Sequence, residues 1–117
     1  MSAKTSIILC TYNEADYIKN TIEKLENNIS NIEIVIVDDN SSDGTVDIIK
    51  KLNEKNQYKT IFRKRSRSLA SAFVRGIVET SGDYIGWLDT NMDELVPKFN
   101  DMIKELEFGS DIVILSR

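Results

Sequence analysis

A continuous run of four β-branched apolar residues at positions 34–37 (Ile-Val-Ile-Val) constrains the fold of this chain more than any other feature. Such a run is typical of a strand buried on both faces, which occurs in parallel sheets covered by helices on both sides. Two carboxylates, Asp38 and Asp39, follow the run, and a helical pattern begins after Gly44. The sequence therefore predicts a strand–loop–helix unit whose acidic loop lies at the ligand-binding edge of a sheet.

Similar apolar runs recur along the chain, about 24 to 28 residues apart, which is the length of one strand-plus-helix unit. They cover residues 6–10, 33–38, 59–62, 83–88 and 111–115. The segments between them carry apolar residues at helical spacing. We therefore expect an α/β fold with three layers (α/β/α), in which helices cover a mostly parallel, Rossmann-like sheet of about five strands.

Several residues at the ends of the predicted helices agree with this pattern. Asn13 and Asp43 are of the residue types that cap a helix N-terminus. Gly82 and Gly109 stand where a glycine commonly ends a helix, and Pro97 suits a first helical turn. We expect residues 1–117 to form one domain. Because the chain stops directly after the fifth predicted strand, we expect it to lack a C-terminal half.

The composition excludes several classes of site. The chain has no histidine, which excludes a Ser-His-Asp mechanism and a His-ligated zinc site. Its single cysteine, Cys10, excludes an intrachain disulfide and is expected to be a buried strand thiol. The net charge of -4 argues against general binding of nucleic acid. No apolar run approaches the ~18 residues of a membrane span, so we expect a cytoplasmic protein, with peripheral attachment to a membrane surface left open.

Polar loops after four of the predicted strands would meet at one edge of the sheet. Acidic and basic side chains lie on separate loops: residues 38–43 and 89–94 carry the acids, and residues 63–68 carry the bases. Carboxylates bind hard divalent cations, and guanidinium groups bind phosphate oxygens. This arrangement suits a diphosphate with a divalent cation.

These segments resemble the family-2 glycosyltransferases of the GT-A fold, especially the transferases that act on polyprenyl phosphates such as dolichol phosphate. The resemblance covers nearly the whole chain in the correct order. It is carried by residues 6–14 (SIILCTYNE), 36–45 (IVDDNSSDGT), 69–72 (LASA) with Gly76, 82–85 (GDYI), 88–91 (LDTN) and 114–117 (ILSR). The resemblance implies the nucleotide-binding half of an enzyme that transfers a sugar from a nucleotide-diphosphate sugar to an acceptor.

The resemblance also implies roles for individual residues. The nucleotide pocket would be lined by Thr11, Tyr12 and Glu14. Asp39 would bind the base or the ribose. The diphosphate would be met by Arg63, Arg65 or Arg67. The acceptor, for which a polyprenyl phosphate is the expectation, and the catalytic base would depend on the half of the family fold that follows Arg117, so no catalytic residue is assigned in this chain.

The metal site that the resemblance implies would hold Mg²⁺ or Mn²⁺. Asp89 and Asn91 occupy the positions of the family's Asp-x-Asp motif, and the metal would stabilise the departing nucleoside diphosphate. Asn91 is a departure from the motif, because an amide is a weaker ligand for a hard cation than a carboxylate. Asp93 is the candidate to replace it, since residues two apart in an extended loop can point the same way.

Other interpretations of these residues remain open at the level of sequence. Asp38 and Asp39 would also suit a simple strand-end turn, residues 89–93 an acidic surface loop, and residues 63–67 a solvated basic loop. A phosphorylatable receiver domain is the alternative function, although receivers place their acidic pair after the first strand. We also expect a homodimer that covers the C-terminal strand and buries Ile112, Ile114 or Leu115.

Overall fold

The structure is a computed structural model that describes residues 3–55, 58–64 and 68–114. Four parallel strands form one sheet in the order β3-β2-β1-β4. The strands are β1 (Thr5–Thr11), β2 (Ile32–Asp38), β3 (Lys59–Phe62) and β4 (Tyr84–Asp89). The helices are α1 (Ile18–Asn28), α2 (Thr45–Lys55), α3 (Leu69–Glu79), the 3-10 helix η1 (Thr90–Lys98) and α4 (Phe99–Glu107). The predicted α/β fold with a parallel sheet is thus confirmed.

The sheet has four strands rather than the five expected. Residues 111–114 form no strand, and the side chains of Ile112 and Ile114 are 77% and 86% exposed. The last three residues, including Leu115, lie outside the described residues. An apolar run favours a strand only when a neighbouring strand accepts its hydrogen bonds, and residues 112–114 have no such pairing. The prediction of a fifth strand at 111–115 is therefore wrong for the part of it that the structure describes.

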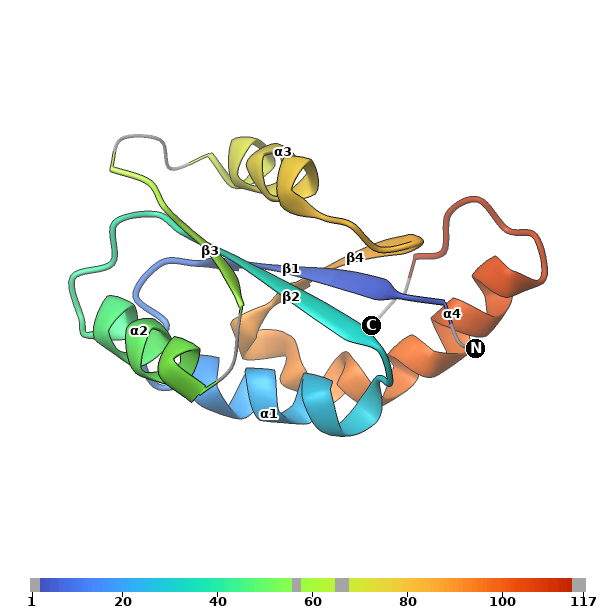
Figure 1. Cartoon of the computed structure of the whole chain (residues 1–117), viewed down its shortest axis with the longest axis horizontal. Helices are drawn as coiled ribbons and strands as arrows, with labels where there is room; N and C mark the ends of the chain where they lie inside the picture. Colours follow the sequence, from blue (N-terminus) through green and yellow to red (C-terminus); the bar gives the residue numbers. More distant parts are fainter. Residues whose placement is uncertain (1–2, 56–57, 65–67, 115–117) are drawn as a thin grey trace.

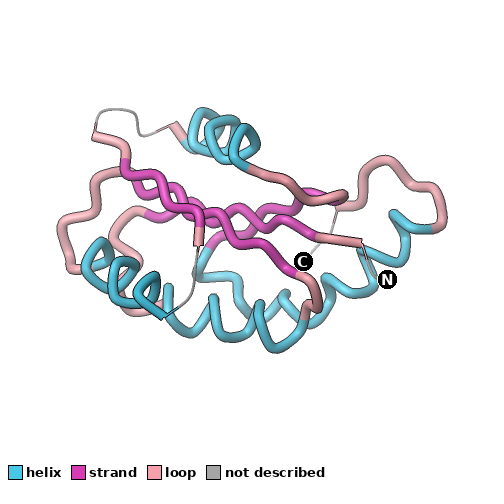
Figure 2. The backbone as a smooth tube through the Cα atoms, viewed as in Figure 1, coloured by secondary structure: helices cyan, strands magenta, loops and turns pink. Residues whose placement is uncertain are grey.

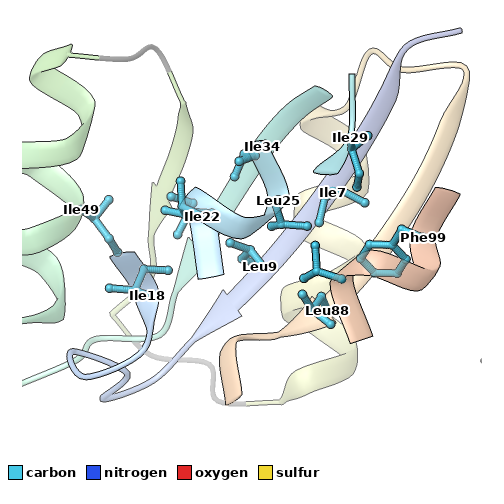
Figure 3. Close-up of a cluster of buried hydrophobic side chains, with 12 residues drawn as sticks. Ile7, Leu9, Ile18, Ile22, Leu25, Ile29, Ile34, Ile49, Leu88 and Phe99 are labelled. Carbon is cyan, nitrogen blue, oxygen red and sulfur yellow. The ribbon is translucent and has the colours of Figure 1, made fainter. Parts of the chain in front are cut away.

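Helices cover both faces of the sheet, as Figures 1 and 2 show. On one face, α1, α2, η1 and α4 pack on the side chains of Ile7, Leu9 and Ile36. Figure 3 shows Ile22 and Leu25 of α1 beside Ile7 and Leu9 of β1. On the other face, α3 packs through Ala72 on the alternate residues of β1 and β2. This alternation explains why residues 34–37 are all apolar: both faces of β2 are buried.

The helix-end predictions are partly confirmed. Asp43 accepts a hydrogen bond from the backbone N–H of Thr45, the first residue of α2, at 3.1 Å, and Gly109 follows α4 with a φ of +113°. Asn13 does not cap α1, which begins at Ile18. Gly82 does not end α3, because Thr80 is the C-cap. A Cβ at Gly82 would lie 2.5 Å from the Ser6 hydroxyl oxygen and 2.7 Å from its backbone N, so this glycine serves close packing instead.

Candidate functional site

The carboxyl ends of the four strands lie level with one another. Strand register pairs Thr11 of β1 with Asp38 of β2, and Asp38 with Phe62 of β3. On the other side of β1, Cys10 pairs with Asp89 of β4. The loops after all four strands therefore start from the same edge of the sheet, as the sequence predicts.

The loops after β1 and β2 are joined by reciprocal hydrogen bonds. The backbone N–H of Asn13 donates to the Ser41 hydroxyl, and the backbone N–H of Ser42 donates to the Asn13 side-chain carbonyl, both at 2.8 Å. One residue further on, the backbone N–H of Glu14 donates to the Thr45 hydroxyl at 2.9 Å. Asn13, which has a φ of +54°, thus holds two loops together and does not cap a helix. These bonds fix Tyr12 and Glu14 relative to the acidic loop.

The two adjacent acids after β2 have different surroundings. Asp38 is fully buried, and its carboxylate accepts hydrogen bonds from the Thr11 hydroxyl and from the hydroxyl and backbone N–H of Ser41. The interpretation of Asp38 as part of a strand-end turn therefore describes its contacts. Asp39 lies beside it, and its carboxylate is free of this turn.

Asp39 forms a two-point ion pair with Arg63. The Arg63 Nε and NH2 groups donate to the two oxygens of the carboxylate, the latter at 2.8 Å. Both side chains are largely buried, with exposed fractions of 14% for Arg63 and 10% for Asp39. The pair raises the pKa of Arg63. The sequence predicted that Asp39 and Arg63 would share one edge of the sheet, but it gave no signal that they bind each other.

Asp39 and Asp89 follow or end the two strands, β2 and β4, that flank β1 with its Cys10. Burial raises the pKa of the Cys10 thiol, and the negative charges of both carboxylates raise it further, while a hydrogen bond from Trp87 opposes them. The thiol is therefore neutral at pH 7 and buried, as expected for a strand cysteine. The strand order places β1 between β2 and β4, so Asp39, which follows β2, and Asp89, which ends β4, lie at the same edge of the sheet.

Glu14 lies within the electrostatic reach of two further carboxylates, Asp89 and Asp43. Burial raises the pKa of Asp89. Burial also raises the pKa of Glu14, and the charges of Asp89 and Asp43 add to this effect. The buried Thr90 hydroxyl lies close to Glu14 and opposes these effects by lowering its pKa. The two groups are nevertheless not aligned for a hydrogen bond. This part of the site has excess negative charge.

The chemistry of these residues fits a divalent cation that is completed by a ligand. Within the described part of the chain, no group of three or more Asp, Glu, Cys or His side chains converges tightly enough to hold a metal by itself. Mg²⁺ and similar hard cations usually bind through one or two carboxylates together with substrate phosphates and water. A single half-buried carboxylate without an ion-pair partner in the described chain, such as Asp89, suits that mode of binding.

The remaining predicted site residues are distributed as follows. Tyr12 is 44% exposed at the rim of the site, whereas Thr11 is buried and its hydroxyl is bonded to Asp38. Asn91 lies in η1, two positions after Asp89 in sequence. Asp93 turns toward α1, where it accepts a hydrogen bond from Asn20 at 2.8 Å and pairs with Lys24 at 3.1 Å. Arg65 and Arg67 lie outside the described residues.

Comparisons with known proteins agree with this geometry. The family described as glycosyl transferase family 2 matches residues 6–117. A dolichol-phosphate mannosyltransferase from Pyrococcus furiosus is 38% identical over 119 residues, which cover 97% of this chain and 33% of that protein. A poly-beta-1,6-N-acetyl-D-glucosamine synthase from Staphylococcus aureus is 34% identical over 97 residues, which cover 80% of this chain and 24% of that protein. The chain thus spans a third or less of the length of these two relatives.

Solved structures show the same fold at low sequence identity. A mannosyltransferase from Pyrobaculum calidifontis, solved in complex with GDP-Man and Mn²⁺, superposes with a TM-score of 0.69 at 22% identity and covers 85% of this chain and 32% of its own. Residues 1–349 of TarS from S. aureus, solved with UDP, give a TM-score of 0.67 at 19% identity and cover 97% of this chain and 38% of that one. Among the described residues, no helix has the length and apolar character needed to cross a bilayer.

Proposed function

This chain belongs to glycosyl transferase family 2, and from that premise we propose that it forms the donor-binding part of an enzyme that transfers a sugar from a nucleoside-diphosphate sugar to an acceptor. One observation carries the proposal: Asp39, which follows β2, and Asp89, which ends β4, come from the two strands that flank β1 and lie at one edge of the sheet. The family match does not support the receiver-domain alternative.

In the proposed complex, each end of the site takes a different part of the donor. Asp39, an acceptor-only carboxylate when ionised, accepts hydrogen bonds from base N–H or ribose hydroxyl groups. Tyr12 and Glu14 border the nucleotide from the joined loops, and Thr11 supports them through its bond to Asp38. At the other end, Asp89 with Asn91 holds the cation, which supplies charge stabilisation to the departing diphosphate.

The metal is Mg²⁺ or Mn²⁺ in this proposal. Support comes from the excess negative charge around Asp89 and from the mannosyltransferase of P. calidifontis, whose structure contains Mn²⁺ and GDP-Man. Asp93 is the less suited ligand, because its carboxylate is paired with Lys24. Arg65 and Arg67 remain the sequence-based candidates for contact with the diphosphate.

For the acceptor, we propose a polyprenyl phosphate. The relative from P. furiosus, which is named as a dolichol-phosphate mannosyltransferase, supports this choice. Such an acceptor implies work at a membrane surface by a cytoplasmic protein, and separation of cell extracts into soluble and membrane fractions tests this location. A protein found only in the soluble fraction would contradict work at a membrane surface.

Thermal unfolding with UDP-sugars and GDP-sugars, with and without Mn²⁺, tests the donor-binding proposal. A ligand that binds only the folded chain, at 100 times its dissociation constant, stabilises the chain by about 2.7 kcal/mol, which raises the melting temperature of a domain of this size by roughly 10 °C. We expect such a rise in melting temperature with the sugar of one of the two nucleotides. The rise should be larger when the nucleotide sugar and Mn²⁺ are added together than when either is added alone. No shift with any nucleotide sugar at millimolar concentration contradicts the proposal.

A homodimer through the edge of the sheet is a separate proposal. β4 is an edge strand, and an apolar groove beside it is lined by Trp87, Phe99 and Ile112 among others. Ile85 and Ile114 are exposed near the same edge. A second copy would cover these apolar side chains and pair with the open strand. Size-exclusion chromatography with light scattering tests this proposal, and a monomer at high concentration would exclude the dimer.

A further inference from the structure

Among the described residues, groups on two sides of Arg63 accept at least four hydrogen bonds from its guanidinium. On one side, its Nε and NH2 groups bond to the two carboxylate oxygens of Asp39. On the other side, its NH1 group donates to the Ser71 hydroxyl at 3.0 Å and its NH2 group donates to the Ser68 carbonyl at 3.3 Å. Ser68 is the N-cap of α3, and Ser71 lies in its first turn. The guanidinium therefore joins the acidic loop after β2 to the start of α3.

The backbone around this ion pair is fixed as well. The backbone N–H of Arg63 donates to the Asp38 carbonyl at 2.8 Å, and the backbone N–H of Asp39 donates to the Thr11 carbonyl at 2.9 Å. Both partners thus start from hydrogen-bonded strand ends. The planar fork of a guanidinium matches a carboxylate at two points, so the Asp39 carboxylate is held in one plane.

Asp39 retains capacity for a ligand in this arrangement. An ionised carboxylate offers about four acceptor positions, and Arg63 uses one on each oxygen. The remaining positions have directions that are set by the ion pair. A guanidinium that is engaged with Asp39, Ser71 and Ser68 is poorly placed to bind a diphosphate, because it would have to break these bonds first.

We infer that Arg63 is a positioning residue for nucleoside recognition, which acts through Asp39 and does not contact the diphosphate. This inference rests on the proposed function, since it takes Asp39 to bind the nucleoside. It assigns a role to Arg63 that differs from the diphosphate contact expected from the sequence. The consequence is that loss of Arg63 weakens binding of the nucleoside itself, with or without phosphates.

The test compares a nucleoside with its diphosphate, using whichever of UDP and GDP binds the wild-type chain more tightly. Dissociation constants are measured by isothermal titration calorimetry at fixed Mn²⁺ for Arg63→Gln, Arg63→Lys and Ser71→Ala. We expect Arg63→Gln to weaken nucleoside and diphosphate by the same factor, about tenfold, as for loss of a hydrogen-bonded charged group. We expect Arg63→Lys to weaken both ligands as Arg63→Gln does, because a lysine keeps the positive charge but lacks the planar guanidinium that binds both carboxylate oxygens. Ser71→Ala is the milder change. It should weaken the binding of nucleoside and diphosphate by one common factor, smaller than the factor for Arg63→Gln.

Two further variants separate positioning from a general effect on the structure. In an Asp39→Asn background, Arg63→Gln should cause little additional loss, because the two residues act as one unit. The matched control is Arg75→Gln, which breaks an exposed ion pair with Glu79 on α3 and should leave both affinities unchanged. Unfolding curves for each variant show that the chain is folded under the conditions of the titration.

Each outcome supports or overturns the inference. Equal losses for nucleoside and diphosphate, without additivity in the Asp39→Asn background, support it. The inference would be overturned if only the affinity for the diphosphate fell, or if Arg63→Lys restored the affinity. It would also be overturned if the losses in the double variant were additive, or if no affinity were lost at all. If the wild-type chain binds neither ligand, the proposed function fails and this inference fails with it. If the wild-type chain binds and the variants show the wrong pattern, only the inference fails.

Discussion

The Asp89 carboxylate lies in surroundings that disfavour its charge in the chain alone. The carboxylate is partly buried at the end of β4 and has no ion-pair partner among the described residues. Burial raises its pKa, because the charged form loses contact with water. A bound cation would reverse this unfavourable environment. The half-buried charge therefore agrees with the proposed metal-binding role of Asp89 and not with a role in stability.

The first prediction concerns Asp89→Asn. The change removes a partly buried charge, so the metal-free chain should melt at a higher temperature than the wild type. The same variant should lose the extra stabilisation that Mn²⁺ gives to the nucleotide-sugar complex. Calorimetric melting with and without Mn²⁺ measures both effects, and an undiminished Mn²⁺ effect in Asp89→Asn would argue against Asp89 as the metal ligand.

Asp93→Asn is the matched comparison and the second prediction. Its ion pair with Lys24 is partly exposed, and such pairs contribute roughly 0 to 1 kcal/mol. We expect a small loss of stability and an unchanged Mn²⁺ effect in the same melting experiment. Loss of the Mn²⁺ effect would mean that Asp93 leaves Lys24 to bind the metal, as the sequence suggested.

The sequence identified the loops of the site better than the partners of each side chain. It placed Asp39 and Asp89 at one edge because the carboxyl ends of parallel strands meet there. The family resemblance singled out Asp39 and not Asp38, but the residue pattern by itself does not show which of two adjacent carboxylates is buried in the turn after the strand. The pairing of Asp39 with Arg63 depends on the order of β2 and β3 in the sheet, which a single sequence does not specify.

At the scale of the elements, a polar cluster around Glu33 joins three strands at the end of the sheet opposite the site. Burial on its own would raise the pKa of Glu33. Hydrogen bonds from the Ser81 backbone N–H, from the Ser6 and Ser81 hydroxyls and from Lys59 lower it instead, to about 2. Lys4 adds a longer ion pair at 3.4 Å. The ionised carboxylate therefore stabilises the folded chain.

The third prediction follows from the lowered pKa of Glu33. The stabilisation is fully present above the unfolded pKa of 4.5 and is lost as the pH falls toward about 2. At pH 7, Glu33→Gln should lower the free energy of unfolding by about 1 to 2 kcal/mol, after allowance for solvent screening. Urea unfolding at pH 7 and pH 3 measures this difference, which should shrink at the lower pH. An equal difference at both values would contradict the role of the charge.

The fourth prediction concerns the close approach of α3 to β1. A Cβ at Gly76 would lie 2.6 Å from the Ile8 Cγ2 atom, in the core between the helix and the sheet. Gly76→Ala should therefore push α3 outward and destabilise the chain by about 1 to 3 kcal/mol, despite the better helix propensity of alanine. Urea unfolding tests this expectation, with Ala70→Ser on the exposed side of α3 as the control. A more stable Gly76→Ala variant would contradict the packing of α3.

At the scale of the whole molecule, the layered architecture followed from the sequence because hydrophobic periodicity reports burial directly. The run at 34–37 is apolar at every position since β2 lies between β1 and β3 with helices on both faces. The run at 111–115 has a similar composition, yet its described part is not a strand. Hydrophobic periodicity shows that burial would stabilise a segment. Whether the segment pairs as a strand depends on a neighbouring strand, which can be distant in the sequence.

An anomalous difference map from a crystal of this chain with Mn²⁺ and GDP or UDP tests the central claim most directly. The claim is that the loops after β1, β2 and β4 form one site for a metal-bound nucleoside diphosphate. The predicted result is a Mn²⁺ peak bound to the Asp89 carboxylate and the diphosphate, with the nucleoside next to Asp39. A nucleotide bound at another face of the molecule, or a Mn²⁺ peak remote from Asp89, would contradict the claim.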